Sequence, residues 1–149
     1  MNPAHVIVRR TEITQATLDR FKDRPFAFGS ADCVQLAAFH LRAMGHRVLL
    51  TKGGRYQTAI GAVRALRRAG HRDLRQALDA MLLEPIAPAA AWTGDIIAMP
   101  PEEGAKIEAL GIALGNGRVL GWHPDAAGAA VLQPDQYLAA WRVPLVEGA

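Results

Sequence analysis

Apolar side chains recur with the period of an α-helix through the first half of the chain. This spacing predicts helices over about residues 11–23, 33–44, 58–69 and 73–84. The last two should form a helical hairpin, because Gly70 suits the end of one helix and Asp73 the cap of the next. Residues 6–8 are Val-Ile-Val, and we expect residues 1–10 to form a short arm or an edge strand.

After Trp92 the pattern changes to short apolar runs separated by Gly, Pro, Asn and Asp. These runs predict strands over about residues 96–99, 110–114, 119–122, 129–132 and 140–143, with a connector over 85–91. Asn116-Gly117 lies between two of the runs, a strong signal for a β-hairpin. Helices followed by antiparallel strands predict an α+β fold, and the length of 149 residues favours a single domain over 1–149.

Composition limits the disulfide, signal-peptide and membrane-spanning features that the chain can have. A single cysteine excludes an intrachain disulfide. The first ten residues lack a signal-peptide pattern, so we expect synthesis in a cytoplasm. No run approaches the roughly 20 apolar residues of a membrane span, so none is expected.

Basic residues concentrate between Arg55 and Arg75, although the net charge is only +3. A solvated helix face is the favoured interpretation, and an acidic protein partner would use the same surface. A nucleic-acid face is less favoured, because Tyr56 is the only aromatic residue in this stretch. The scattered histidines and one cysteine show no metal-ligand spacing, and no phosphate-binding glycine loop is present, so neither a metal nor another cofactor is expected.

Cys33 is the candidate for chemistry. Ser30 and Asp32 are good N-cap residues, which places Cys33 in the first turn of a helix. The positive end of a helix dipole favours a thiolate there. The alternative is a small apolar side chain in the core.

Three stretches together resemble the NlpC-type cell-wall peptidases of the papain-like superfamily. They are Phe28-Gly-Ser-Ala-Asp-Cys33, residues 94–97 (Gly-Asp-Ile-Ile) and residues 110–117 (Leu-Gly-Ile-Ala-Leu-Gly-Asn-Gly). The chain resembles still more closely a group of small phage proteins of that superfamily. That likeness adds Gly54-Arg55-Tyr56, the Arg-rich helix ending at Gly70, and Ala-Trp-Arg-Val over residues 140–143.

The resemblance implies a papain-like fold in which the N-terminal helices, including the Cys33 helix, pack on a C-terminal antiparallel sheet. It also makes Cys33 the nucleophile position. The general base of these peptidases is a histidine at the start of the next strand, where this chain has Ala109, and the residue that orients the base falls at about Gly121.

No other histidine is an obvious replacement for the base. His40 follows Cys33 by two helical turns, about 10 Å, which exceeds hydrogen-bond reach. His123, two residues beyond Gly121 and expected on the same strand face, is the best candidate base, with a satisfied or exposed histidine as the alternative.

The expected function follows from the missing base. We expect a structural or assembly component of a phage or phage-like tail tip or baseplate, docked on other tail proteins of the hub type, carried in the virion and lacking catalysis. The alternative is an active cysteine hydrolase that cleaves cell-wall peptides during genome delivery. Cys33 would then be the nucleophile, with His123 or a histidine from another chain as base.

Overall fold

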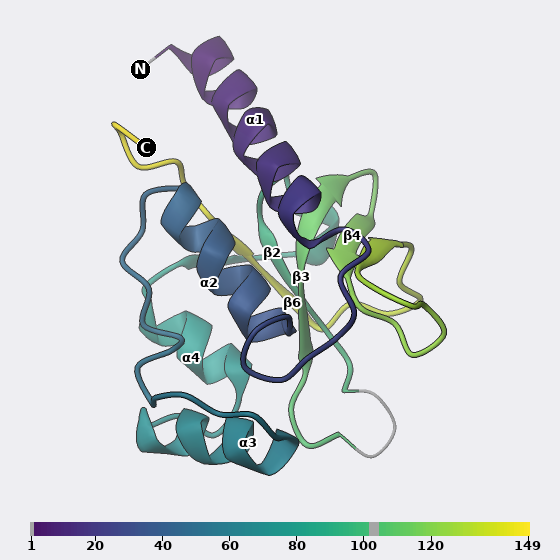
Figure 1. The fold of residues 1–149 in the computed structure, drawn as a ribbon. Helices are drawn as coiled ribbons and strands as arrows, with labels where there is room; N and C mark the ends of the chain where they lie inside the picture. Colours follow the sequence, from purple (N-terminus) through teal and green to yellow (C-terminus); the bar gives the residue numbers. More distant parts are fainter. Residues whose placement is uncertain (1, 102–104) are drawn as a thin grey trace.

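The computed structural model describes residues 2–101 and 105–149. Its helices are α1 (Pro3–Phe21), α2 (Cys33–Ala43), α3 (Ala59–Arg68), α4 (Leu74–Ala80) and the short 3-10 helix η1 (Pro88–Ala90). Its strands are β1 (Glu84–Ile86), β2 (Ile96–Met99), β3 (Ala109–Gly115), β4 (Arg118–Gly121), β5 (Ala130–Leu132) and β6 (Ala139–Arg142). Helices in the first half and strands in the second confirm the predicted α+β class (Figure 1).

The strands form one sheet in the order β1-β6-β2-β3-β4-β5, and all paired neighbours are antiparallel. The predicted hairpin joins β3 to β4. Gly115 pairs with Arg118, so the loop between them is Asn116-Gly117. Both loop residues have positive φ, 54° and 77°, as the tight hairpin turn requires.

The main core lies between α2 and one face of the sheet. Leu36, Leu41 and Met44 of the α2 region are fully buried against apolar side chains of the central strands. Those strand residues are Ile96, Ala98, Leu110, Ile112 and Leu120. Because α2 packs directly on β3, the first residue of α2 is held close to the beginning of that strand.

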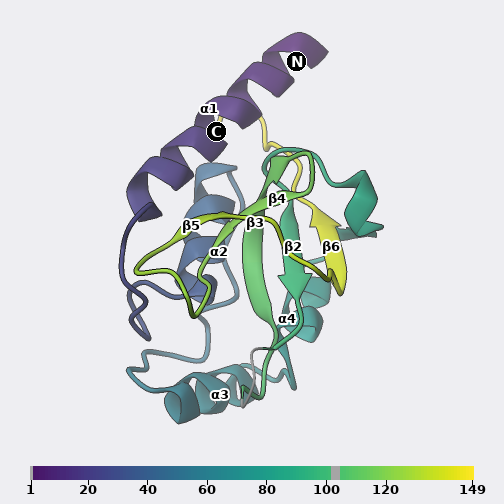
Figure 2. The ribbon, with the colours of Figure 1, turned by 90° about the vertical axis from the view of Figure 1, so that its right-hand side faces the viewer.

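The expectation of an arm or edge strand over residues 1–10 is wrong for the described residues, because α1 begins at Pro3. Asn2 caps the helix by accepting a hydrogen bond from the Ala4 N–H at 2.9 Å, and Pro3 suits the first helical position. These signals outweigh the strand preference of residues 6–8. The first turns of α1 extend beyond the sheet, leaving Ile7 and Val8 exposed (Figure 2).

Two further boundaries differ from the predicted ones. The predicted connector over residues 85–91 contains most of β1, which pairs with β6, and all of η1. Helix α4 ends at Ala80 rather than near residue 84. None of the helices in the described part of the chain is both long enough and apolar enough to cross a membrane.

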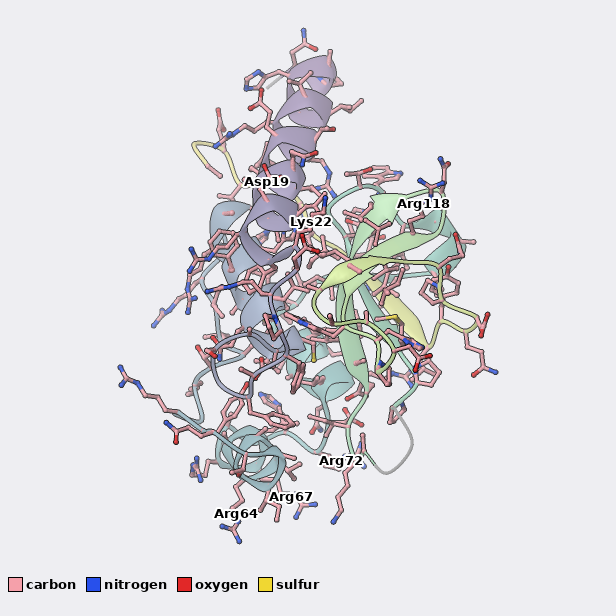
Figure 3. The ribbon with its side chains drawn as sticks, turned by 45° about the vertical axis from the view of Figure 1, so that its right-hand side comes forward. Asp19, Lys22, Arg64, Arg67, Arg72 and Arg118 are labelled. Atoms are coloured by element: carbon pink, nitrogen blue, oxygen red, sulfur yellow. The ribbon has the colours of Figure 1, made fainter. Side chains whose placement is uncertain are left out.

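The basic residues of α3 lie on its outer face. Arg64, Arg67 and Arg68 are exposed, and Figure 3 shows Arg64, Arg67 and Arg72 directed away from the body of the protein. This exposure is expected both of a solvated helix face and of a surface for an acidic partner.

Candidate functional site: the Cys33 cleft

Cys33 is the first residue of α2, and Asp32 is the cap of that helix, as predicted. One carboxylate oxygen of Asp32 accepts the Gln35 N–H at 2.8 Å. The other accepts the Gly29 N–H at 2.8 Å and the Tyr56 hydroxyl at 2.7 Å. Asp32 is therefore a fully bonded, buried residue that fixes the start of α2.

Glycines allow the loop before α3 to approach the start of α2. Gly29 has φ +85°, and a Cβ there would lie 2.0 Å from the carbonyl oxygen of Tyr56. A Cβ at Gly53 would lie 1.7 Å from the carbonyl oxygen of Ala65 in α3. Burial and the Asp32 carboxylate raise the pKa of Tyr56, so its hydroxyl stays a hydrogen-bond donor. Tyr56, the last residue of the Gly-Arg-Tyr motif, thus has a structural role.

Cys33 lines a cleft of about 370 Å³. Four aromatic residues, Phe26, Phe28, Tyr56 and Trp122, contribute to its walls. The Phe26 ring stands edge-to-face against Phe28 and Trp122, with centroid distances of 4.8 and 5.8 Å. The remaining lining residues are Asp32, Val34, Ala62, Ala105, Ile107, Glu108, Ala109, Leu110, His123, Pro124 and Ala126.

The surroundings of Cys33 favour the thiol over the thiolate. Burial raises the pKa of Cys33 to about 12, the nearby carboxylates of Asp32 and Glu108 act in the same direction, and a hydrogen bond with the Leu110 backbone only partly opposes them. The first-turn position alone favours a thiolate, but this effect is smaller than the burial effect. Cys33 is therefore uncharged at neutral pH.

The position expected for the base holds a methyl group. Ala109 is the first residue of β3 and lines the same cleft as Cys33. Gly121, the position expected for the orienting residue, ends β4 and is not among the cleft residues.

His123 lines the cleft, but its ring is bonded elsewhere. It lies beyond the end of β4, in a loop rather than on the predicted strand, and its side chain is 55% exposed. Its Nδ1 accepts the Asp125 N–H at 3.1 Å and lies 3.6 Å from the Asp125 carboxylate. Both contacts of Nδ1 are with Asp125, so this ring nitrogen faces its own loop. Within the described residues, no hydrogen bond joins His123 to Cys33.

His40 is a buried structural residue, in agreement with its exclusion as a base. Its Nε2 donates to the Gly94 carbonyl at 2.8 Å, and its Nδ1 accepts from the Thr17 hydroxyl at 2.9 Å. Burial lowers the pKa of His40 to about 4, so the ring is neutral at physiological pH.

Asp95, in the Gly-Asp motif, forms a buried ionic cluster away from the cleft. One carboxylate oxygen accepts from Arg10 Nη2 at 2.9 Å and from the Val143 N–H at 3.0 Å. The other accepts the Trp92 N–H at 2.8 Å and lies 3.4 Å from Arg142 Nε. The Arg142 guanidinium stacks on Trp92, 3.3 Å from the ring centroid. The Gly-Asp and Ala-Trp-Arg-Val motifs therefore meet in this Asp95 cluster, and none of its five residues lines the cleft.

Sequence reasoning missed this cluster and one cleft residue. An arginine within α1 and an aspartate directly before an apolar strand were the available signals for the cluster. Glu108 precedes β3, lines the cleft and is 6% exposed, and its Oε1 accepts the Leu74 N–H at 2.7 Å. Its sequence context carries no special signal, because the contact with Leu74 depends on the fold. Across residues 2–101 and 105–149, no three His, Cys, Asp or Glu side chains gather as a metal site.

Comparison with known proteins assigns the chain to a family. No curated protein matches the sequence. Residues 9–143 match the sequence profile of a family described as a domain of unknown function (DUF6950). This match includes α2, the cleft and the Asp95 cluster, and covers most of the chain. The chain therefore belongs to the DUF6950 family.

Proposed function

We propose that this protein is a catalytically inactive papain-like domain that serves as a structural component of a phage or phage-like tail tip or baseplate. It would be made in the host cytoplasm and carried in the virion tail, docked on a hub-type protein. The observation that carries the inactive part of the proposal is Ala109, which lines the cleft beside Cys33 where a histidine base would be needed. The resemblance to small phage proteins carries the tail assignment.

Two features support the loss of catalysis. A cysteine hydrolase needs a thiolate and a base within hydrogen-bond reach, and removal of one partner of such a pair removes most of the rate enhancement. Burial instead raises the pKa of Cys33 to about 12, and the Nδ1 of His123 is bonded to the Asp125 amide. The helix cap and the Asp95 cluster maintain the fold without serving a reaction.

The test uses virus particles that carry Cys33→Ala. We expect stoichiometric copies of this chain in purified particles and an infectivity equal to that of the wild type. Asp95→Ala is the matched structural control, and we expect it to reduce incorporation of the chain into particles. Normal particles with a large loss of infectivity for Cys33→Ala would contradict the inactive assignment, and particles without the chain would contradict the assembly assignment.

One observation favours the alternative function, a cysteine hydrolase that acts on cell-wall peptides. His123 lines the same cleft as Cys33, although no hydrogen bond joins them within the described residues. A rearrangement of its loop, or a histidine from a neighbouring chain, would then supply the base. Release of peptide fragments from purified peptidoglycan by assembled particles, abolished by Cys33→Ala, would favour this alternative.

A further inference from the structure

Glu108 presents an incompletely bonded carboxyl group to the cleft. The side chain is 6% exposed, and its Oε1 accepts the Leu74 N–H at the start of α4. Its Oε2 has no hydrogen-bond or ion-pair partner among residues 2–101 and 105–149. Lys106, two residues earlier, is exposed and makes no ion pair with it in this part of the chain. Oε2 is not enclosed, because Arg142 Nη1 is the one buried side-chain polar atom without a partner in this part of the chain. A cationic group that enters the cleft can therefore reach Oε2, and the apolar walls strengthen the attraction between the two charges.

The second carboxyl group of the cleft has no such capacity. Asp32 already accepts three hydrogen bonds, from Gln35, Gly29 and Tyr56. Of the two carboxylates that line the cleft among residues 2–101 and 105–149, Glu108 is therefore the one with an oxygen available to a ligand.

The rest of the cleft is suited to an apolar stem. Phe26 and Phe28 are 47% and 39% exposed, and Ile107, Trp122 and Pro124 also line the cleft. Its volume of about 370 Å³ lies at the lower end of the range of small-ligand sites, about 300–1,000 Å³. Lysine and arginine combine an apolar methylene stem with a charged head, and aromatic rings also attract such cations.

We propose that the cleft binds a lysine or arginine side chain of a partner polypeptide, whose charged head donates a hydrogen bond to Glu108 Oε2. The inference rests on the proposed function, because it names how the inactive cleft takes part in docking. An acidic or purely apolar side chain would leave the Glu108 carboxylate unpaired. Among the side chains that fit between the apolar walls, the cleft should therefore prefer one with a positive charge, because of Glu108.

The test compares two probes, acetyl-Ala-Lys-Ala-amide and the same peptide with norleucine in place of lysine. Binding is followed by NMR through the indole N–H signal of Trp122, which is assigned with Trp122→Phe. We expect the lysine peptide to bind the wild-type chain about tenfold or more tightly than the norleucine peptide, because a hydrogen bond to a charged group is stronger than apolar contact alone.

Glu108→Gln is the decisive variant, because its amide oxygen still accepts the Leu74 N–H while the charge is lost. We expect this variant to bind the two peptides equally. Asp125→Asn is the matched control, since it removes an exposed carboxylate near the cleft, and it should keep the preference for lysine. If Glu108→Gln does not fold, the peptide comparison on the wild type decides alone.

Three results would overturn the proposal: equal binding of both peptides to the wild type, an unchanged lysine preference in Glu108→Gln, or no shift of the Trp122 signal at millimolar peptide. The failure would be distinguishable from failure of the proposed function. If particles contain the chain but the peptides do not bind, only the proposed cleft ligand is contradicted. Lysine-selective binding by a chain absent from particles would remove only the assembly role.

Discussion

The Asp95 cluster and the Cys33 cleft contain the motifs on which the expected relationship to a peptidase depends, but the two regions differ in what surrounds their central residue. In the Asp95 cluster, both carboxylate oxygens accept hydrogen bonds and two arginines share the one carboxylate. The Arg142 Nη1 is buried there without a hydrogen-bond partner in the described residues. In the cleft, the Cys33 thiol has a raised pKa, and Ala109 lies where the resemblance leads us to expect a base.

This difference shows that the residues of the Asp95 cluster stabilise the fold, whereas any reaction would have to take place at Cys33. Gly94 has φ +95°, and a Cβ there would lie 3.0 Å from the Thr14 hydroxyl and 3.3 Å from Arg10 Nη2. The Gly-Asp motif is thus explained by its place beneath α1, without any reaction. A motif residue can therefore be needed for the fold alone, whereas the proposed loss of activity depends on the protonation of Cys33 and on the absence of a hydrogen bond between Cys33 and His123 in the described residues.

The largest expected effect is that of Asp95→Ala on stability. The change leaves Arg10 and Arg142 without their buried counter-charge and removes four bonded contacts. We expect a loss of about 3–5 kcal/mol in the free energy of unfolding, measured with urea. The control Asp125→Ala removes a carboxylate that is 91% exposed and should change stability by about 0.5 kcal/mol or less. Similar losses of stability in both variants would show that the buried Asp95 carboxylate stabilises the fold no more than the exposed Asp125 carboxylate does.

Acid should lower the free energy of unfolding through His40. This residue lies beside the Asp95 cluster and is bonded to the Gly94 carbonyl. Its pKa is about 4 in the folded chain against 6.5 when unfolded. Above pH 6.5 the ring is neutral in both states. As the pH falls from 6.5 to 4, the unfolded chain binds a proton that the folded chain does not, so stability should fall by about 3 kcal/mol in total.

The measurement for His40 is the difference between the urea stabilities of the wild type and His40→Gln across this pH range. The variant lacks the titrating group, so it should lose less stability on acidification. Parallel pH profiles would show that His40 titrates normally in the folded chain.

A smaller effect is expected at the start of α2. Asp32→Ala removes a helix cap and two further hydrogen bonds and should destabilise the fold by about 2 kcal/mol. Tyr56→Phe removes one of these bonds and should lose about 1 kcal/mol. The double variant should be about as stable as Asp32→Ala alone. The only further loss expected is the packing of the Tyr56 hydroxyl. Additive losses would mean that the Tyr56–Asp32 bond contributes nothing.

The smallest expected effect is that of Cys33→Ala, about 1 kcal/mol or less, because only one sulfur atom at the wall of a cleft is removed. Thermal unfolding of the wild type and the variant measures it. A loss as large as that of Asp95→Ala would make Cys33 a major core residue.

Local signals in the sequence predicted much of the fold. Asp32 as a cap identified the start of α2, and Asn116-Gly117 identified the β3–β4 hairpin, since both features depend on neighbours in the chain. The start of α1 differs from the prediction, because the helix cap at Asn2 and the proline after it outweigh the strand preference of residues 6–8.

The candidate site was predictable only in part. Cys33, Ala109 and His123 were all singled out from the sequence, and all three line the cleft. The role of Glu108 and the raised pKa of Cys33 were missed. Both depend on burial and on contacts between distant segments, which a pattern along the chain does not reveal.

The most direct measurement is the pH dependence of Cys33 alkylation by iodoacetamide in the folded protein. With a pKa of about 12, the folded chain should react at pH 8 at least about 100-fold more slowly than the urea-unfolded chain. The rate should rise steadily up to at least about pH 10, and His123→Ala should leave it unchanged. A fast reaction with a plateau near neutral pH, lost in His123→Ala, would reveal a thiolate paired with an imidazole and contradict the assignment of an inactive cleft.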